Sequence, residues 1–202
     1  MVSVDELGAA ILAGGASRRF GSHKSLALLH GKTMVESAVA SVKPLTNNMV
    51  IVSHPDIHNN LEQMTGLPTM VDEERFQGHG PLAGIYSAFQ RLNKEWLMVV
   101  PCDVPNLSES FLRWLLSCGE HEKSIDGIIP RSEGRLQPLI AVYHRNSVPV
   151  IEKLLNKGQR RMQDLIEQMR FRIVSADGHF PPETFVNVND RQTLNEFVNS
   201  DG

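Results

Sequence analysis

Two adjacent glycines and three basic side chains follow the first apolar run of the chain. The run ends in the segment L-A-G-G-A-S-R-R-F-G-S-H-K, residues 12–24, which places Arg18, Arg19 and Lys24 within one short loop. Glycine accepts positive φ and lets backbone N–H groups come close to a ligand. Successive N–H groups in such a turn form a nest for anions. Because crowded like charges repel, an anion is expected among them, and the loop predicts a phosphate site.

The spacing of this loop excludes two common phosphate motifs. Gly15 and Gly21 bracket five residues and Lys24 comes three later, so the loop is not a Walker A motif. Gly14 and Gly15 are adjacent, which also excludes the dinucleotide fingerprint. The pattern L-A-G-G-x-S-x-R-x-G-x-x-K instead resembles the signature loop of nucleotidyltransferases. A surface loop with solvated charges is the alternative, which the glycines and Lys24 at these offsets disfavour.

Two aspartates come at the ends of predicted strands. Asp103 follows an apolar run in V-V-P-C-D-V-P, and Asp72 ends the shorter run that begins at Thr69. In a parallel α/β sheet, ligands bind beyond the carboxyl ends of the strands. A triphosphate site needs a dication, and Mg²⁺ prefers one or two carboxylates with phosphate oxygens and water. We therefore expect Asp103 to hold Mg²⁺ and Asp72 to contact a nucleotide or the hydrated metal, although either could be a simple turn residue.

A third glycine-rich segment, G-H-G-P-L-A-G-I at residues 78–85, leads into a predicted helix. Proline suits the first turn of a helix. The N-terminus of this helix could face an anion or the edge of a base. Gly84 lowers helix stability unless its small size is needed for packing or for a ligand.

Composition limits the classes of function. The chain has 202 residues and a net charge of −3, so it lacks the excess of basic residues that bulk nucleic-acid binding needs. No apolar run approaches the length of a membrane span, and the N-terminal residues lack the pattern of a secretory signal. Cys102 and Cys118 are expected to be reduced thiols, which together with these features predicts a cytoplasmic protein. The histidines, His54 and His58 included, show no spacing typical of metal ligands.

The elements that must position these residues alternate between strands and helices. This alternation predicts one α/β domain over residues 1–202, with a mostly parallel central sheet between two helical layers. Apolar runs without alternation, such as residues 9–12 and 96–100, are typical of strands covered on both faces. The expected strands are residues 9–12, 49–52, 69–71, 96–100, 127–129, 139–143, 171–174 and 185–188. The expected helices are residues 33–42, 59–64, 82–92, 108–116, 147–156, 162–169 and 190–198.

With these motifs in order, the chain resembles the molybdenum cofactor guanylyltransferase (MobA-like) family over nearly its whole length. The resemblance rests on the glycine loop, on V-D at residues 71–72, on G-P-L-A-G at 80–84 and on P-C-D-V-P at 101–105. Later pieces distinguish this family from sugar-phosphate nucleotidyltransferases: Q-P-L-I-A at 137–141, G-x-R-R at 158–161 and F-V-N-V-N at 185–189. The resemblance implies a Rossmann-like nucleotidyltransferase fold.

The family resemblance also implies a set of site residues. The nucleotide-binding positions would be Leu12, Ala13, Gly14, Gly15, Lys24, Ser53, Asp72 and Asp103, with Mg²⁺ on Asp103. Some family members carry asparagine where this chain has Ser53. Lys24 and either Arg18 or Arg19 would neutralise the β- and γ-phosphates. Arg160 and Arg161 could meet the acceptor phosphate or simply begin a solvated helix, and Asn187 and Asn189 could line the acceptor site or satisfy a turn.

The implied reaction is transfer of GMP from GTP to the terminal phosphate of molybdopterin, with release of pyrophosphate. An ionised phosphate nucleophile needs no general base, and positioning and charge neutralisation would carry most of the catalysis. Cofactor-assembly proteins and target apoenzymes are further expected partners. Two alternatives stay open: cytidylyl or sugar-phosphate transfer by the same chemistry, and a non-catalytic adaptor that binds nucleotide or cofactor.

Overall fold

The computed structural model describes residues 5–14, 23–119 and 124–200. These residues form an eight-stranded sheet and a separate two-stranded hairpin. No helix among them is both long enough and apolar enough to cross a membrane. The strands are β1 (Leu7–Ala13), β2 (Leu28–Leu29), β3 (Lys32–Thr33), β4 (Met49–Ser53), β5 (Thr69–Met70), β6 (Trp96–Pro101), β7 (Gly127–Ser132), β8 (Arg135–Leu136), β9 (Ala141–His144) and β10 (Phe171–Ser175). The helices are α1 (Met34–Val42), α2 (His58–Thr65), α3 (Pro81–Leu92), α4 (Glu109–Ser117), α5 (Ser147–Asn156), α6 (Met162–Ile166) and α7 (Arg191–Ser200).

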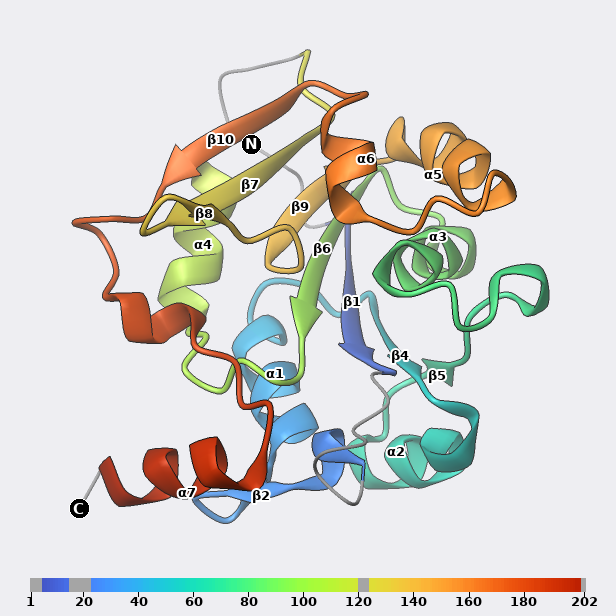
Figure 1. The fold of residues 1–202 in the computed structure, drawn as a ribbon. Helices are drawn as coiled ribbons and strands as arrows, with labels where there is room; N and C mark the ends of the chain where they lie inside the picture. The colour runs from blue at the N-terminus through green and yellow to red at the C-terminus, as the bar shows by residue number, and fades with distance from the viewer. Residues whose placement is uncertain (1–4, 15–22, 120–123, 201–202) are drawn as a thin grey trace.

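The large sheet has the strand order β10-β7-β9-β6-β1-β4-β5, with β8 paired to β7 (Figure 1). Strands β6, β1, β4 and β5 run parallel to one another, as do β7 and β10. Strand β9 is antiparallel to both of its neighbours, β6 and β7. The expected α/β fold with a mostly parallel central sheet is confirmed, and its parallel half carries the motifs of the first hundred residues.

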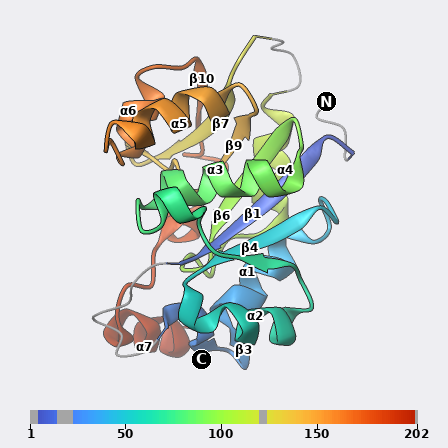
Figure 2. The same ribbon diagram turned by 90° about the vertical axis from the view of Figure 1, so that its right-hand side faces the viewer.

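Helices cover both faces of the sheet, which explains why its central strands are apolar without alternation. Along β1, Ala9 and Ile11 pack into the core under α1 and α4, whereas Ala10 packs into the core under α3 and α5. Figure 2 shows α3, α5 and α6 in front of the sheet and α1 and α4 behind it. The molecule is therefore layered α/β/α, as expected.

Local signals in the sequence set several helix starts. The Thr33 side chain accepts the N–H of Glu36, whose carboxylate reaches back to Thr33, which makes a capping box at α1. The Ser108 hydroxyl caps α4 by accepting the N–H of Phe111. At the start of α7, the Asp190 carboxylate accepts the N–H of Thr193 over 2.8 Å. The expected starts of these helices are confirmed to within a residue or so.

The expected strand at residues 185–188 is wrong. The chain forms a short 3-10 turn at Pro182–Phe185 and then runs on without pairing as a strand. Pro181 and Pro182 remove two backbone donors just before the apolar residues, which disfavours a strand. Phe185 and Val188 are apolar because each is buried in a core cluster. Helix α6 also ends earlier than expected, at Ile166.

Candidate functional site

The motif residues meet at the carboxyl ends of three adjacent parallel strands. In the pairing of β1 with its neighbours, Leu12 lies opposite Pro101 of β6, and Ala13 lies opposite Ser53 of β4. The N–H of Cys102 donates to the Leu12 carbonyl over 3.1 Å, so β6 stays level with β1 to its end. Residues that follow these strands are thus delivered to one edge, where open α/β sheets bind ligands.

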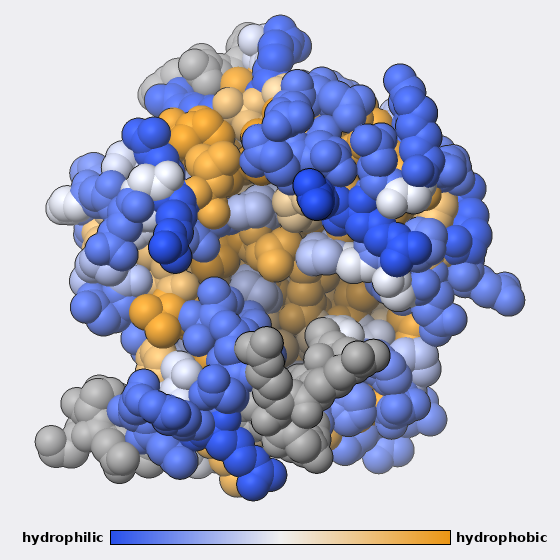
Figure 3. Space-filling model, viewed as in Figure 1, coloured by the Kyte–Doolittle hydropathy of each residue, from blue (hydrophilic) through white to orange (hydrophobic). Residues whose placement is uncertain are grey.

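A cavity of about 450 Å³ opens at this edge. Its volume lies within the range of small-molecule sites. Figure 3 shows an apolar hollow in the middle of this face of the molecule, with hydrophilic residues around it. The cavity is lined by Leu12, Ala13, Gly14, Lys24, Ser25, Val52, His54, Asp72, Gly78, Gly80, Pro81, Gly84, Pro101, Cys102, Asp103 and Leu139.

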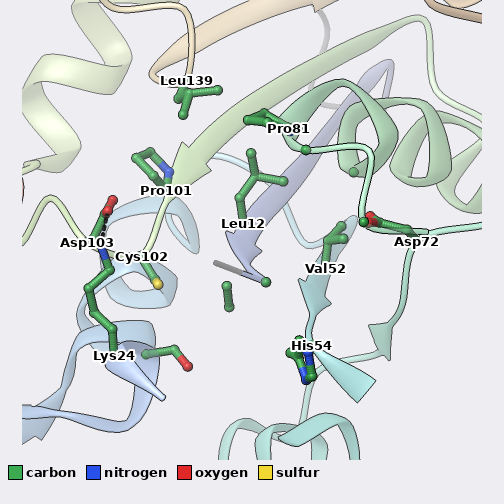
Figure 4. A pocket seen from close by; sticks show the side chains of 16 residues that line it. Leu12, Lys24, Val52, His54, Asp72, Pro81, Pro101, Cys102, Asp103 and Leu139 are labelled. Carbon is green, nitrogen blue, oxygen red and sulfur yellow. Dashed lines mark hydrogen bonds and ion pairs between the residues drawn. The ribbon is translucent and has the colours of Figure 1, made fainter. Parts of the chain in front are cut away.

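A lysine and an aspartate form an ion pair at one side of the cavity. The Nζ of Lys24 donates to the Oδ2 of Asp103, and the two side chains point toward each other in Figure 4. The pair is largely withdrawn from solvent, because the two side chains are 15% and 20% exposed. Lys24, which was expected to bind phosphate, and Asp103, which was expected to hold Mg²⁺, therefore lie together beside one cavity.

Val188 and Asn189, just before α7, contact the Lys24–Asp103 pair. The N–H of Val188 donates to the backbone carbonyl of Asp103 over 2.8 Å. This bond brings Asn189 close enough for its Oδ1 to accept from the Nζ of Lys24 over 3.3 Å. Asn189 thus contacts Lys24, although it is exposed and is not among the residues that line the cavity. Asn187 is exposed and is not among the residues that line the cavity.

Asp72 lies at the opposite side of the cavity from the ion pair (Figure 4). Burial raises the pKa of its carboxyl, while a hydrogen bond from the backbone N–H of Gly78 acts in the lowering direction. A half-buried carboxylate that costs free energy to ionise is typical of functional sites rather than of solvated turns. Gly78 and Gly80 have φ of 73° and 76°, which only glycine adopts freely, so both glycines are needed for this turn.

Helix α3 packs against the cavity wall through Gly84. A Cβ at this position would lie 3.1 Å from the Cδ2 of Leu12, 3.4 Å from the Cγ1 of Val52 and 3.6 Å from the Oδ1 of Asp72. Each of these neighbours also lines the cavity. The glycine in mid-helix therefore lets α3 approach the ends of β1 and β4 closely.

The hydroxyl of Ser25, beside Lys24, is buried within the part of the chain that the structure describes. Ser25 is 2% exposed, lines the cavity, and its Oγ makes no hydrogen bond within the described residues. An unpaired buried hydroxyl costs free energy. Because Ser25 directly follows Lys24 and lines the cavity, its hydroxyl can donate a hydrogen bond to a ligand there.

The cavity also exposes the edge of a thiol that stays protonated. Burial, with a smaller contribution from the charge of Asp103, raises the pKa of Cys102 to about 12. The thiolate is the reactive form of cysteine, and it is scarce at neutral pH under these conditions. Cys102 therefore lines the site without serving as a nucleophile.

The structure places most of the predicted site residues around one cavity. Leu12, Ala13, Gly14, Lys24, Asp72 and Asp103 all line it. Ser53 does not: it is buried, and its hydroxyl donates to the Met70 carbonyl over 3.4 Å, toward β5. Gly15, Arg18 and Arg19 lie outside the described residues. Arg160 and Arg161 are exposed between α5 and α6 and are not among the lining residues.

Several lining residues were not predicted as part of the site, among them Ser25, His54 and Leu139. Ser25 and His54 each directly follow a residue that the analysis singled out, Lys24 and Ser53, so their proximity could have been noticed. Leu139 belongs to the Q-P-L-I-A motif but was expected to lie in a strand; β9 begins only at Ala141, which frees Leu139 to reach the cavity.

Known proteins resemble this chain over most of its length. Residues 9–173 match the MobA-like NTP transferase domain family. The chain is 36% identical to a "probable molybdenum cofactor guanylyltransferase" of Bacillus cytotoxicus, over 93% of this chain and 94% of that one. It is 37% identical to a protein of the same name from Geobacillus sp. strain WCH70, over 96% and 97% of the two chains.

Solved structures share the fold. The crystal structure of molybdopterin-guanine dinucleotide biosynthesis protein A from Archaeoglobus fulgidus superposes with a TM-score of 0.80 at 23% identity, over 94% of this chain and 96% of that one. A 4-diphosphocytidyl-2C-methyl-D-erythritol synthase from Anaerococcus prevotii gives a TM-score of 0.75 at 11% identity, over 95% and 94%. The second likeness means that the fold alone does not select the nucleotide base. The family match and the near-full-length relatives together show that the chain belongs to the MobA-like NTP transferase family.

Proposed function

We propose that this protein transfers GMP from GTP to the terminal phosphate of molybdopterin and releases pyrophosphate. The observation that carries the proposal is the Lys24–Asp103 ion pair at the side of a 450 Å³ cavity, opposite the half-buried Asp72. A nucleoside triphosphate has a charged phosphate end and an end with ribose and base. The cavity offers a cation at one side for the first and a hydrogen-bond acceptor at the other side for the second. The relatives named guanylyltransferases, similar over nearly the whole chain, support this donor and this acceptor.

The triphosphate is assigned to the side of the cavity that holds Lys24. The Lys24 ammonium and the hydroxyl of Ser25, which has no hydrogen-bond partner among the described residues, can each donate to phosphate oxygens. The remainder of the nucleotide would extend toward Asp72 and the glycine turn at residues 78–80. The Asp72 carboxylate can accept hydrogen bonds from a base or from ribose hydroxyls.

The donor set fits Mg²⁺. Asp103 supplies a carboxylate at the cavity and already attracts a cation, the Lys24 ammonium. Oxygen ligands, with one or two carboxylates and substrate phosphates, are what Mg²⁺ selects. Asp103 would hold the ion, which when bound neutralises phosphate charge and stabilises the charge of the transition state. Lys24, released from Asp103, would then contact phosphate oxygens.

The protein's own contribution to the transfer is positioning and charge neutralisation. An oxygen of the acceptor phosphate forms a bond to the α-phosphorus of GTP while the bond from that phosphorus to the bridging oxygen of pyrophosphate breaks. Lys24 stabilises the negative charge that develops on the departing pyrophosphate. The acceptor phosphate is already ionised at neutral pH, so no side chain must remove a proton, and Cys102 stays a neutral thiol.

The acceptor is assigned to the C-terminal half of the chain. Leu139 from the turn before β9 and Asn189 from the segment before α7 both reach the site, from elements beyond the nucleotide motifs. Molybdopterin would approach the Lys24–Asp103 pair from the side of the cavity that Leu139 lines. Hand-over to cofactor-assembly proteins and apoenzymes is part of the proposal, with no surface assigned to it.

The test is turnover by the purified protein with molybdopterin, Mg²⁺ and each of GTP, CTP, ATP and UTP in separate reactions. Joining of guanylate alone to the pterin phosphate is the expected result. Asp103→Asn should abolish this turnover, whereas Glu109→Gln, on the exposed surface of α4, should leave it intact. Transfer from CTP alone would mean that the donor is CTP and not GTP. If the folded protein binds GTP but transfers no nucleotide, the proposal is overturned.

A further inference from the structure

Two histidines and an aspartate, one of which lines the cavity, lie close together. His23 directly precedes the 3-10 turn Lys24–Leu26, His54 directly follows β4, and Asp56 lies in the next 3-10 turn. One potential ligand atom from each residue lies within 4.8 Å of the others. His54 also lines the cavity, and Figure 4 shows it well apart from Asp103. The three residues are called here the His23 cluster. His54 and Asp56 are close in the sequence, but His23 comes from a separate segment, which is why no ligand spacing revealed the cluster.

The contacts within the His23 cluster leave like atoms facing each other. The single lone pair of His54 Nδ1 accepts the backbone N–H of Asp56 over 3.3 Å, so a metal bound at this nitrogen would replace that hydrogen bond. The same nitrogen lies 3.3 Å from the Oδ2 of Asp56, which is also an acceptor. The Nε2 of His23 lies 4.0 Å from that oxygen, beyond hydrogen-bond distance. A cation bound by the three atoms would offset the charge of the Asp56 carboxylate and take the place of the Asp56 N–H at His54 Nδ1.

The donor chemistry selects the class of cation. Two neutral imidazoles and one carboxylate suit zinc and its first-row neighbours, whereas Mg²⁺ and Ca²⁺ require oxygen ligands. Zinc bonds of about 2.0–2.2 Å at tetrahedral angles place neighbouring ligand atoms about 3.3–3.6 Å apart. The observed separation of 3.3 Å already fits, and that of 4.0 Å needs only a small side-chain adjustment. The side chains of His23, His54 and Asp56 are 30%, 38% and 70% exposed, so an ion can reach them.

We propose that the His23 cluster binds a transition-metal dication of the zinc class, at a site separate from the Mg²⁺ position on Asp103. Three protein ligands leave a fourth coordination position for water or for a ligand in the cavity. The bound ion joins the residue before Lys24 to the end of β4, and so fixes the start of the turn that carries the phosphate-binding lysine. The metal site itself does not depend on the proposed transfer reaction.

The experiment measures Zn²⁺ binding to the full chain after treatment with a chelator, without nucleotide or Mg²⁺, by competition with a chromophoric chelator. One Zn²⁺ per chain is expected, and His23→Gln or His54→Gln should each weaken binding by at least about 10-fold. Asp56→Asn changes a largely exposed side chain and should weaken binding without affecting folding. His30→Asn is the matched control: it removes an exposed histidine whose φ of 47° asparagine tolerates, and binding should stay at the wild-type level.

A thermal-shift measurement supplies a second readout. With free Zn²⁺ about 100-fold above Kd, Tm should rise by about 5–10 °C in the wild type and far less in the His23 and His54 variants. Two results would overturn the proposal. The first is wild-type binding no tighter than that of His54→Gln. The second is loss of Zn²⁺ binding in Asp103→Asn or after blocking the thiols, with the histidine variants unaffected. Neither result bears on nucleotide transfer, which the turnover experiment tests by itself.

Discussion

Replacement of Lys24 and Asp103, singly and together, measures how strongly the two side chains attract each other in the nucleotide-free protein. Two unit charges about 4 Å apart attract by about 4 kcal/mol at an effective dielectric constant of about 20. Desolvation offsets part of this attraction: exposed pairs yield about 0.2–1 kcal/mol, and removal of one partner from a buried pair costs about 3–5 kcal/mol. With side chains 15% and 20% exposed, this pair lies between those limits. We expect a coupling energy of about 1–3 kcal/mol.

The assay is urea unfolding of the wild type, Lys24→Met, Asp103→Asn and the double variant, without nucleotide. A loss of about 2 kcal/mol in a single variant would lower Tm by about 4–8 °C in a chain of this length. The exposed i,i+4 pair Glu109–Arg113 is the matched control, and its coupling should stay below about 0.5 kcal/mol. Additivity of the Lys24 and Asp103 changes to within about 0.3 kcal/mol would refute the reasoning, because it would mean that the two charges do not interact.

Three further substitutions probe the cavity wall. Burial raises the pKa of Asp72 above its ordinary value of 3.8, so the ionised carboxylate lowers the free energy of unfolding. This destabilisation is absent well below pH 3.8 and is complete above the raised pKa. Asp72→Asn should therefore increase the free energy of unfolding at pH 7, lose this advantage in acid, and weaken nucleotide binding; a destabilised variant at pH 7 would contradict this. Ser25→Ala should leave stability unchanged or higher but weaken GTP binding by about 10–100-fold, as loss of a hydrogen bond to a charged group implies; equal affinities by calorimetry would remove Ser25 from the phosphate site. Gly84→Ala gains about 1 kcal/mol of helix propensity, but its Cβ crowds the cavity wall. GTP affinity should therefore fall while Tm changes little; unchanged affinity would show that the neighbouring side chains move to make room.

The elements of the parallel half could be predicted because their signals are local. An apolar run buried on both faces gives a central strand, and the carboxyl end of such a strand fixes where the next residues lie. Residues 9–12 and 96–100 were expected as strands and form the cores of β1 and β6. Asp103 and the glycine-loop residues Leu12 to Gly14 consequently meet at one cavity, as the order of the motifs predicted.

The remainder depended on contacts between distant segments. Residues 185–188 carry an apolar pattern that a strand would also show, and only the tertiary structure reveals that Phe185 and Val188 are anchors in the core. The direction of the Ser53 hydroxyl depends on its pairing with β5, through the Met70 carbonyl. The His23 cluster likewise forms only when the residue before Lys24 comes to the end of β4, which no spacing along the chain encodes.

The most direct measurement of the central claim follows the label from GTP into the pterin product. With molybdopterin, Mg²⁺ and GTP labelled at the α-phosphate, guanylyl transfer should place the label in the pterin dinucleotide. With GTP labelled at the γ-phosphate, the label should appear only in pyrophosphate. Label from the γ-phosphate in the product would mean phosphoryl rather than guanylyl transfer. Absence of both labels from the product, with GTP still bound by the protein, would contradict the account of this cavity as a nucleotidyl-transfer site.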